Sequence, residues 1–202
     1  MFRVTHKFAI VVSAVALTTV ACATPPQAQL DQATAALNEA ATAQASEYAP
    51  DSFSAAKDAQ AKLDAELKAQ EGNFALTRSY GEAKKLATAA TEAARKAAQD
   101  AVRQKAIAQK EASTAVADAR TAIQDAETAL TGAPKGKGSK ADLDALKSDL
   151  AAATSTLGEA EGSLKAERYA DVKAKAAAAK EKATTVKSAI DQAIQARKGG
   201  RR

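Results

Sequence analysis

The chain of 202 residues carries 29 basic and 24 acidic residues, so its formal net charge is +5 at pH 7. Trp is absent, and the only His and the only Cys are His6 and Cys22. The chain beyond Cys22 therefore lacks the commonest general base, the thiol nucleophile and the usual ligands of zinc and other transition metals. We expect no enzyme activity, no metal, no cofactor and no internal disulfide.

The first 21 residues are typical of a signal peptide. Arg3 and Lys7 make the start basic, and residues 8–20 carry no charge. That apolar stretch is shorter than the roughly 20 residues needed to span a bilayer. A basic start, a short apolar run and small residues favour cleavage over membrane anchoring. We therefore assign residues 1–21 to a signal peptide.

Residues 18–22, Thr-Thr-Val-Ala-Cys, resemble the lipobox of bacterial lipoproteins. The resemblance implies that cleavage follows Ala21, that Cys22 is acylated, and that residues 22–26 form the lipidated Cys and a Pro-containing spacer. More than one acyl chain is enough for stable membrane anchoring. Asp after the Cys would imply retention at the inner membrane, so Ala23 favours the outer membrane, facing the periplasm. The alternative is an ordinary secreted protein in which the Cys has no such role.

Basic residues are concentrated in a linker and at the C-terminus. Lys135, Lys137 and Lys140 lie in the linker. Residues 198–202 form a basic tail with Lys198, Arg201 and Arg202, and Arg197 directly precedes it. Along the expected helices Asp and Glu alternate with Lys, as on a solvated surface, whereas a nucleic-acid interface needs a clustered basic face. We expect no nucleic-acid partner. The tail either contacts anionic head groups or cell-wall polymers, or is a solvated chain end.

Beyond the spacer, good helix formers dominate and apolar residues do not alternate, so we expect an all-α protein. Gly72 and Gly162 should adopt the left-handed conformation just past a helix end. Phe74 and Leu164 should then make the hydrophobic contact of each cap. The expected helices are 27–47, 51–71, 79–131, 140–161 and 168–197.

The two halves of the chain resemble each other in the order of their breaks. The matches that a high Ala content does not explain are Ala49-Pro50 with Ala133-Pro134, Gly72 with Gly162, and Tyr80 with Tyr169. A duplication makes each half one structural module. We predict two tandem three-helix units, 27–105 and 106–197, that share the long helix in an elongated antiparallel bundle. Because the neighbouring helices are each only about 30 Å long, residues 98–110 should have the fewest packing partners.

This order of an Ala-Pro break, an apolar-periodic helix, a turn and a Tyr resembles an uncharacterised family of Ala-rich helical domains in bacterial envelope lipoproteins. The resemblance covers residues 24–105 and is repeated over 119–197. No activity is established for the family. The resemblance therefore implies a structural class and a location, but no mechanism.

Three tyrosines are candidate partner contacts: Tyr48, Tyr80 and Tyr169. Exposed rings could stack on a glycan or a protein, whereas rings packed at helix junctions would be structural; the equivalence of Tyr80 and Tyr169 favours packing.

We expect a lipid-anchored, non-enzymatic structural or adaptor lipoprotein of the cell envelope. The sequence does not determine its oligomeric state. The alternative is a helical module that recruits an envelope protein or a peptidoglycan or glycan partner. A contiguous exposed apolar patch would favour that alternative, and a mixed-charge surface would not.

Overall fold

The structure is a computed structural model that describes residues 24–133 and 140–199. Over these residues the chain is helical apart from short connections, and it contains no strand. The expected all-α fold is therefore confirmed. The elements are α1 (Gln27–Thr42), α2 (Ala45–Tyr48), α3 (Pro50–Gly72), the 3-10 turn η1 (Ala75–Thr77), α4 (Gly81–Thr131), α5 (Lys140–Lys165) and α6 (Tyr169–Gly199).

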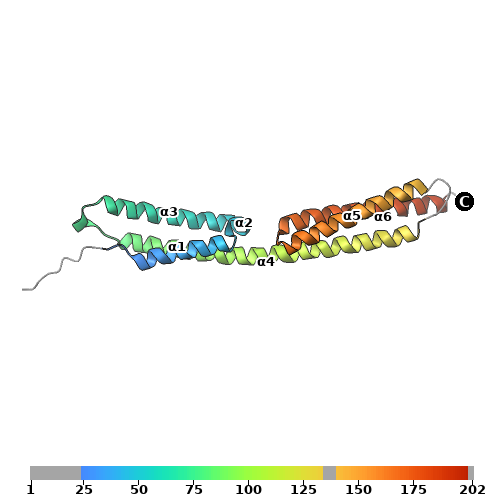
Figure 1. Ribbon diagram of the computed structural model, residues 1–202. Coiled ribbons are helices and arrows are strands. Elements are labelled where there is room, and N and C mark those ends of the chain that lie inside the picture. The colour runs from blue at the N-terminus through green and yellow to red at the C-terminus, as the bar shows by residue number, and fades with distance from the viewer. Residues whose placement is uncertain (1–23, 134–139, 200–202) are drawn as a thin grey trace, which may run out of the picture.

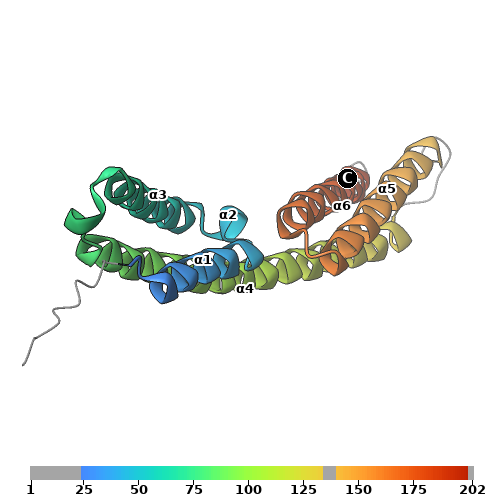
Figure 2. The ribbon, with the colours of Figure 1, turned by 60° about the vertical axis from the view of Figure 1, so that its left-hand side comes forward.

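Helix α4 is the axis of a rod (Figure 1). Its 51 residues correspond to about 77 Å at a rise of 1.5 Å per residue. Helices α1, α2 and α3 pack on its first part, and α5 and α6 pack on its last part. Figure 2 shows that α4 is the only helix that continues from one group to the other. The two tandem units that share one long helix are thus confirmed.

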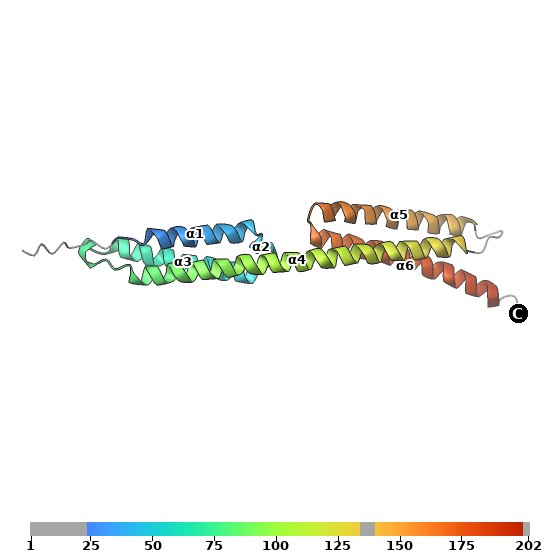
Figure 3. The ribbon, with the colours of Figure 1, turned by 90° about the horizontal axis from the view of Figure 1, so that it is seen from below.

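The two ends of the described chain lie at opposite ends of the rod. Helix α1 runs from the outer end of the first unit towards the middle, and α6 runs from the middle to the far end (Figure 3). The connection between α3 and α4 lies at the same end as the start of α1. Residues 24–26 and the end of α6 are therefore separated by about the length of α4.

Alanine forms most of the seams between the helices. Small side chains let helices approach closely, but each buries little apolar area, at roughly 25 cal/mol per Å². Large side chains that are fully buried are few: Leu63 in the first unit, and Val172, Val186 and Ile190 in the second. The seam on the first part of α4 follows a spacing of three or four residues, which defines one helix face: Ala83, Ala87, Ala90, Ala94, Ala97 and Ala101.

The middle of α4 lies between the two units and has no buried residue over positions 102–111. The buried residues on either side are Ala101 and Ala112, both 0% exposed, whereas Val102 is 63% exposed. This agrees with the prediction that residues 98–110 have the fewest partners. The unpacked stretch begins only after Ala101, because that residue belongs to the core of the first unit.

We expect Gln104→Pro to bend the rod at a low cost in stability. Proline removes a backbone hydrogen bond and kinks a helix, but Gln104 is exposed and lies in the stretch of α4 that has no buried residue, so little packing would be lost. Small-angle scattering of the soluble protein without its first 23 residues should give a smaller radius of gyration for the variant. The unchanged protein should itself exceed the roughly 16 Å of a compact chain of about 180 residues.

A proline at a buried position of the same helix is the matched control. Ala119 is 0% exposed, so Ala119→Pro breaks packing as well as the helix and should cost clearly more free energy of unfolding. Chemical denaturation compares the two variants directly. Equal losses would show that the middle of α4 contributes as much packing as the units do.

The first predicted helix, 27–47, is wrong as a single helix, because the chain turns at Gln44. Gln44 has a φ of 59° and separates α1 from α2. A residue other than Gly in this left-handed conformation costs on the order of 1–2 kcal/mol. The turn places Ala45 and Ala49 in the core that the first unit forms with α4, and this burial offsets the cost.

The cap predicted at Gly72 is also wrong. Gly72 ends α3 without adopting the left-handed conformation, and Phe74 is 71% exposed instead of covering the helix end. Asn73 is extended, and its amide donates to the carbonyl of Gln70 at 3.2 Å. Polar groups of the following turn, rather than an apolar contact, complete this helix end.

The second predicted cap, at Gly162, is wrong because α5 continues through Gly162 to Lys165. The left-handed residue is Glu167, with a φ of 57°. Its amide donates to the carbonyl of Leu164 at 3.1 Å, and the next amide donates to the carbonyl of Ser163 at 3.0 Å, which is the Schellman pattern. The extra turn buries Ser163 and packs Leu164 on the core, which offsets the roughly 1 kcal/mol that Gly costs within a helix.

Candidate functional site

In the described part of the chain, no three or more His, Cys, Asp or Glu residues come together in a way that could hold a metal ion. None of the described helices has the length and hydropathy needed to cross a membrane. The candidate surfaces are therefore a depression on α6, the junction between the units and the two ends of the rod.

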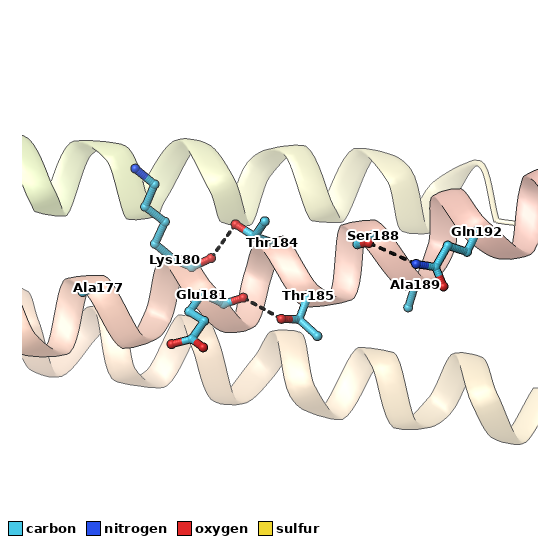
Figure 4. A pocket seen from close by; sticks show the side chains of 8 residues that line it. All are labelled: Ala177, Lys180, Glu181, Thr184, Thr185, Ser188, Ala189 and Gln192. Carbon is cyan, nitrogen blue, oxygen red and sulfur yellow. Dashed lines mark hydrogen bonds between the residues drawn. The ribbon is translucent and has the colours of Figure 1, made fainter.

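The depression on α6 is open, and most of the polar side chains that line it already have partners (Figure 4). The hydroxyl of Thr184 donates to the carbonyl of Lys180 at 2.8 Å, and that of Thr185 donates to the carbonyl of Glu181 at 3.0 Å. The ammonium of Lys180 points to α4, where it lies 2.9 Å from a carboxylate oxygen of Asp118. The lining comes from one helix face, so no set of groups converges on a ligand.

Tyr48 and Tyr169 meet where the two units adjoin. Their ring centroids are 6.5 Å apart and the rings are inclined by 54°, within the range of favourable aromatic pairs. Tyr48 ends α2 and packs on the cores of both units, whereas Tyr169 begins α6 and is only 3% exposed. The burial of Tyr169 agrees with packing at a helix junction rather than with an exposed ring that stacks on a partner.

An ion pair beside the two rings also links the units. The ammonium of Lys105 on α4 lies 2.6 Å from a carboxylate oxygen of Glu167, and this hydrogen bond raises the pKa of Lys105. Burial, assisted by a hydrogen bond with Glu47, raises the pKa of Tyr48 to about 12. At neutral pH the phenol therefore stays protonated and the ammonium stays charged. Neither group is activated as a base or a nucleophile, so the junction acts as a packing contact.

Tyr80 lies at the outer end of the first unit, just before α4. It is half-buried and packs on the core cluster that includes Leu63 and Ala83. Tyr80, like its repeat equivalent Tyr169, thus lies at a helix junction. Tyr80 and Tyr169 are not brought together, because α3–α4 connect at the outer end of the rod and α5–α6 connect at its middle.

The turn before Tyr80 exposes two large apolar side chains. Phe74 and Leu76 are 71% and 63% exposed. The turn nevertheless has a regular structure, because Ala75–Thr77 form a 3-10 turn. The hydroxyl of Thr77 donates to the carbonyl of Phe74 at 2.8 Å. The side chain of Arg78 donates back to the end of α3.

The remaining predicted site residues lie at the chain ends. Cys22 is outside the described residues, as are Arg201 and Arg202. Arg197 is exposed near the end of α6. Lys198 is within α6, and its side chain is not among those described. The backbone thus places the start of the tail at the end of the rod opposite to residues 24–26.

The remaining surface carries mixed charges. Exposed ion pairs connect α4 and α6 at Lys173–Glu111, 2.9 Å, and α5 and α6 at Lys175–Glu159, 3.0 Å. Such exposed pairs contribute about 0–1 kcal/mol each. Within the first unit, hydrogen bonds from Lys96 and Ser52 lower the pKa of Asp100 to about 2. Acidic and basic side chains are thus interspersed along the helices, and several of them pair with a neighbour.

Sequence reasoning missed the exposed turn and the pair between Lys105 and Glu167. The turn had a detectable signal, because Phe74 and Leu76 fall between two helices and belong to no periodic apolar face. The ion pair had none, since its residues are separated by 62 positions and both resemble ordinary surface residues.

Comparisons of the chain with family models, curated proteins and solved structures gave no match. The resemblance to envelope lipoproteins therefore stays a prediction from the residues themselves.

Proposed function

We propose that this protein is a lipid-anchored, non-enzymatic structural lipoprotein of the bacterial cell envelope, and that it acts as a rod-shaped spacer. In this proposal Cys22 carries the lipid, the outer membrane is the anchoring membrane, and the helical body projects into the periplasm. The far end of α6, with the basic tail beyond it, contacts a second envelope component such as cell-wall polymer or another envelope protein.

One observation carries the proposal: the described chain begins and ends at opposite ends of a rod. A lipid attached just before residue 24 would hold one end at a membrane. The continuous helix α4 would then place the end of α6 on the order of 77 Å away. A helix without Gly or Pro between residues 82 and 131 is a simple way to maintain such a distance.

The surface supports a spacer over a binding module. The exposed large apolar side chains of the described chain are Phe74, Leu76, Val102 and Ile107. They form two small groups, at the α3–α4 turn and at the middle of α4, rather than one contiguous patch. Partner-binding surfaces are marked by apolar patches of several hundred Å², and the mixed-charge helix faces lack that feature.

Site-specific photo-crosslinking in intact cells tests the spacer role. A photoreactive residue at Gln195, exposed near the end of α6, should form adducts with the distal envelope component. The same residue at Thr88 or Thr114, exposed on α4 in the first and second units, should form few. Adducts confined to Thr88 or Thr114 would contradict the spacer and favour a module that recruits a partner through one helix face.

A further inference from the structure

The turn between α3 and α4 presents two exposed large apolar side chains, one of which, Phe74, is the most exposed of the described chain. Phe74 is 71% exposed and Leu76 is 63% exposed. In Figures 1 and 3 the turn lies beyond the first turn of α1, at the outermost point of this end of the rod. The turn would therefore be the part of this end closest to a surface against which the rod stood end-on.

The turn is held in shape by hydrogen bonds rather than left as a loose loop. The guanidinium of Arg78 donates to the carbonyl of Asn73 at 3.1 Å and to that of Glu71 at 2.9 Å. The amide of Ser79 donates to the side-chain oxygen of Gln70 at 3.0 Å. These bonds satisfy several polar groups of the turn. Phe74 and Leu76 remain largely exposed to solvent.

This arrangement suits the boundary of a bilayer. Polar backbone groups that enter an apolar phase must be paired internally, because little water is present to pair them. Apolar side chains, by contrast, gain free energy when they leave water. The turn between α3 and α4 has part of its polar groups paired internally and carries the exposed Phe74 and Leu76, as such a boundary favours.

The position of the N-terminal chain indicates which surface is close. Cys22 precedes Gln27, the first residue of α1, by five residues. Five extended residues span at most about 18 Å. A lipid at Cys22 would therefore hold the start of α1 within that distance of the membrane, on the same end of the rod as Phe74 and Leu76.

The second unit provides an internal comparison. In the repeat, Leu164 corresponds to Phe74, but Leu164 packs on the core and the α5–α6 connection is a short Schellman turn at Glu167. That connection lies in the middle of the rod, away from both ends. Of these two described helix connections, only the one at the end from which the N-terminal chain departs exposes large apolar side chains.

We infer that Phe74 and Leu76 insert into the interface of the bilayer that carries the lipid anchor, so that the turn docks the rod end-on to its own membrane. This inference rests on the proposed acylation of Cys22. The lipid supplies attachment, and the turn supplies a second contact that sets the angle of the rod to the membrane.

The test uses the acylated protein with a single free thiol, since Cys22 is blocked by the lipid. Leu76→Cys is labelled with an environment-sensitive nitrobenzoxadiazole dye and reconstituted into phosphatidylethanolamine–phosphatidylglycerol vesicles containing lipids with a doxyl quencher. The dye emission should shift to shorter wavelength and be quenched by the doxyl lipid. A dye at Thr131→Cys, exposed at the far end of α4, should show neither change.

A second variant excludes insertion by the dye alone. Phe74→Ser in the Leu76→Cys background removes the neighbouring apolar side chain and should reduce both the shift and the quenching. Unshifted emission at Leu76→Cys would overturn the inference, and so would a shift without doxyl quenching, which would indicate a second protein copy on the turn. Intact mass of the same preparation reports acylation separately, so a missing lipid and an undocked turn are distinguished.

Discussion

Replacing Cys22 by Ala should abolish incorporation of radioactive palmitate and remove the mature protein from the membrane fraction. Cys22 is the only thiol of the chain, so no other residue can form the thioether through which a lipoprotein is anchored. Because stable attachment needs more than one acyl chain, the effect should be complete rather than partial. Immunoblots should show either unprocessed precursor or a soluble periplasmic form.

A matched control changes the next residue. Ala23→Asp should leave palmitate labelling intact, because the thiol remains, while it should move the protein to the inner membrane if the sorting rule implied by the lipobox resemblance applies. Normal labelling of the Cys22→Ala protein would remove the basis for anchoring, and with it the proposed spacer.

Leu63→Ala should unfold the first unit at a much lower temperature than the second. Leu63 is 0% exposed and is the only fully buried large side chain among Ala33, Ala83, Ala87 and Ala90 in its core cluster. Truncating a buried Leu to Ala costs about 2–5 kcal/mol. The half-buried Leu30, Leu67, Tyr80 and Leu86 pack against this cluster and can move partly into the cavity, so we expect a cost near the middle of that range.

The effect should be largest in the first unit, because residues 102–111 of α4 contain no buried residue and the two cores meet at the junction of Tyr48 and Tyr169. Thermal unfolding followed by far-ultraviolet circular dichroism should become biphasic, with one helical transition shifted down and one nearly unchanged. The control is Leu76→Ala, since Leu76 is 63% exposed and its truncation should change the free energy of unfolding by about 0.5 kcal/mol or less. A single cooperative shift for Leu63→Ala would show that the units unfold together.

The long helix was predictable because its determinants are local. Between residues 82 and 131 good helix formers occur without Gly or Pro, and each residue favours the helix independently of its tertiary contacts. Pro50 likewise marks the first turn of α3, where its missing amide costs nothing. The spacing of Ala at three and four residues then predicted a helical bundle in which small side chains bury little apolar area between the helices.

The break at Gln44 and the passage of α5 through Gly162 were not predictable from local preferences. Each local preference is worth about 1 kcal/mol, and packing of apolar neighbours such as Ala45 and Leu164 outweighs it. Which neighbours are buried depends on where α4 runs. The same reason explains why Leu164 packs while Phe74, its counterpart in the repeat, is exposed.

The sequence by itself determined the helical class, the long shared helix and the two units. These features depend on the composition and on short-range spacing, whose effects do not require tertiary contacts. Only the tertiary structure decided that Tyr48 and Tyr169 meet between the units, that Lys105 pairs with Glu167, and that the apolar turn shares an end with the start of α1. Those contacts join residues distant in the chain, and their free energies exist only once α4 has fixed the positions of the helices around it.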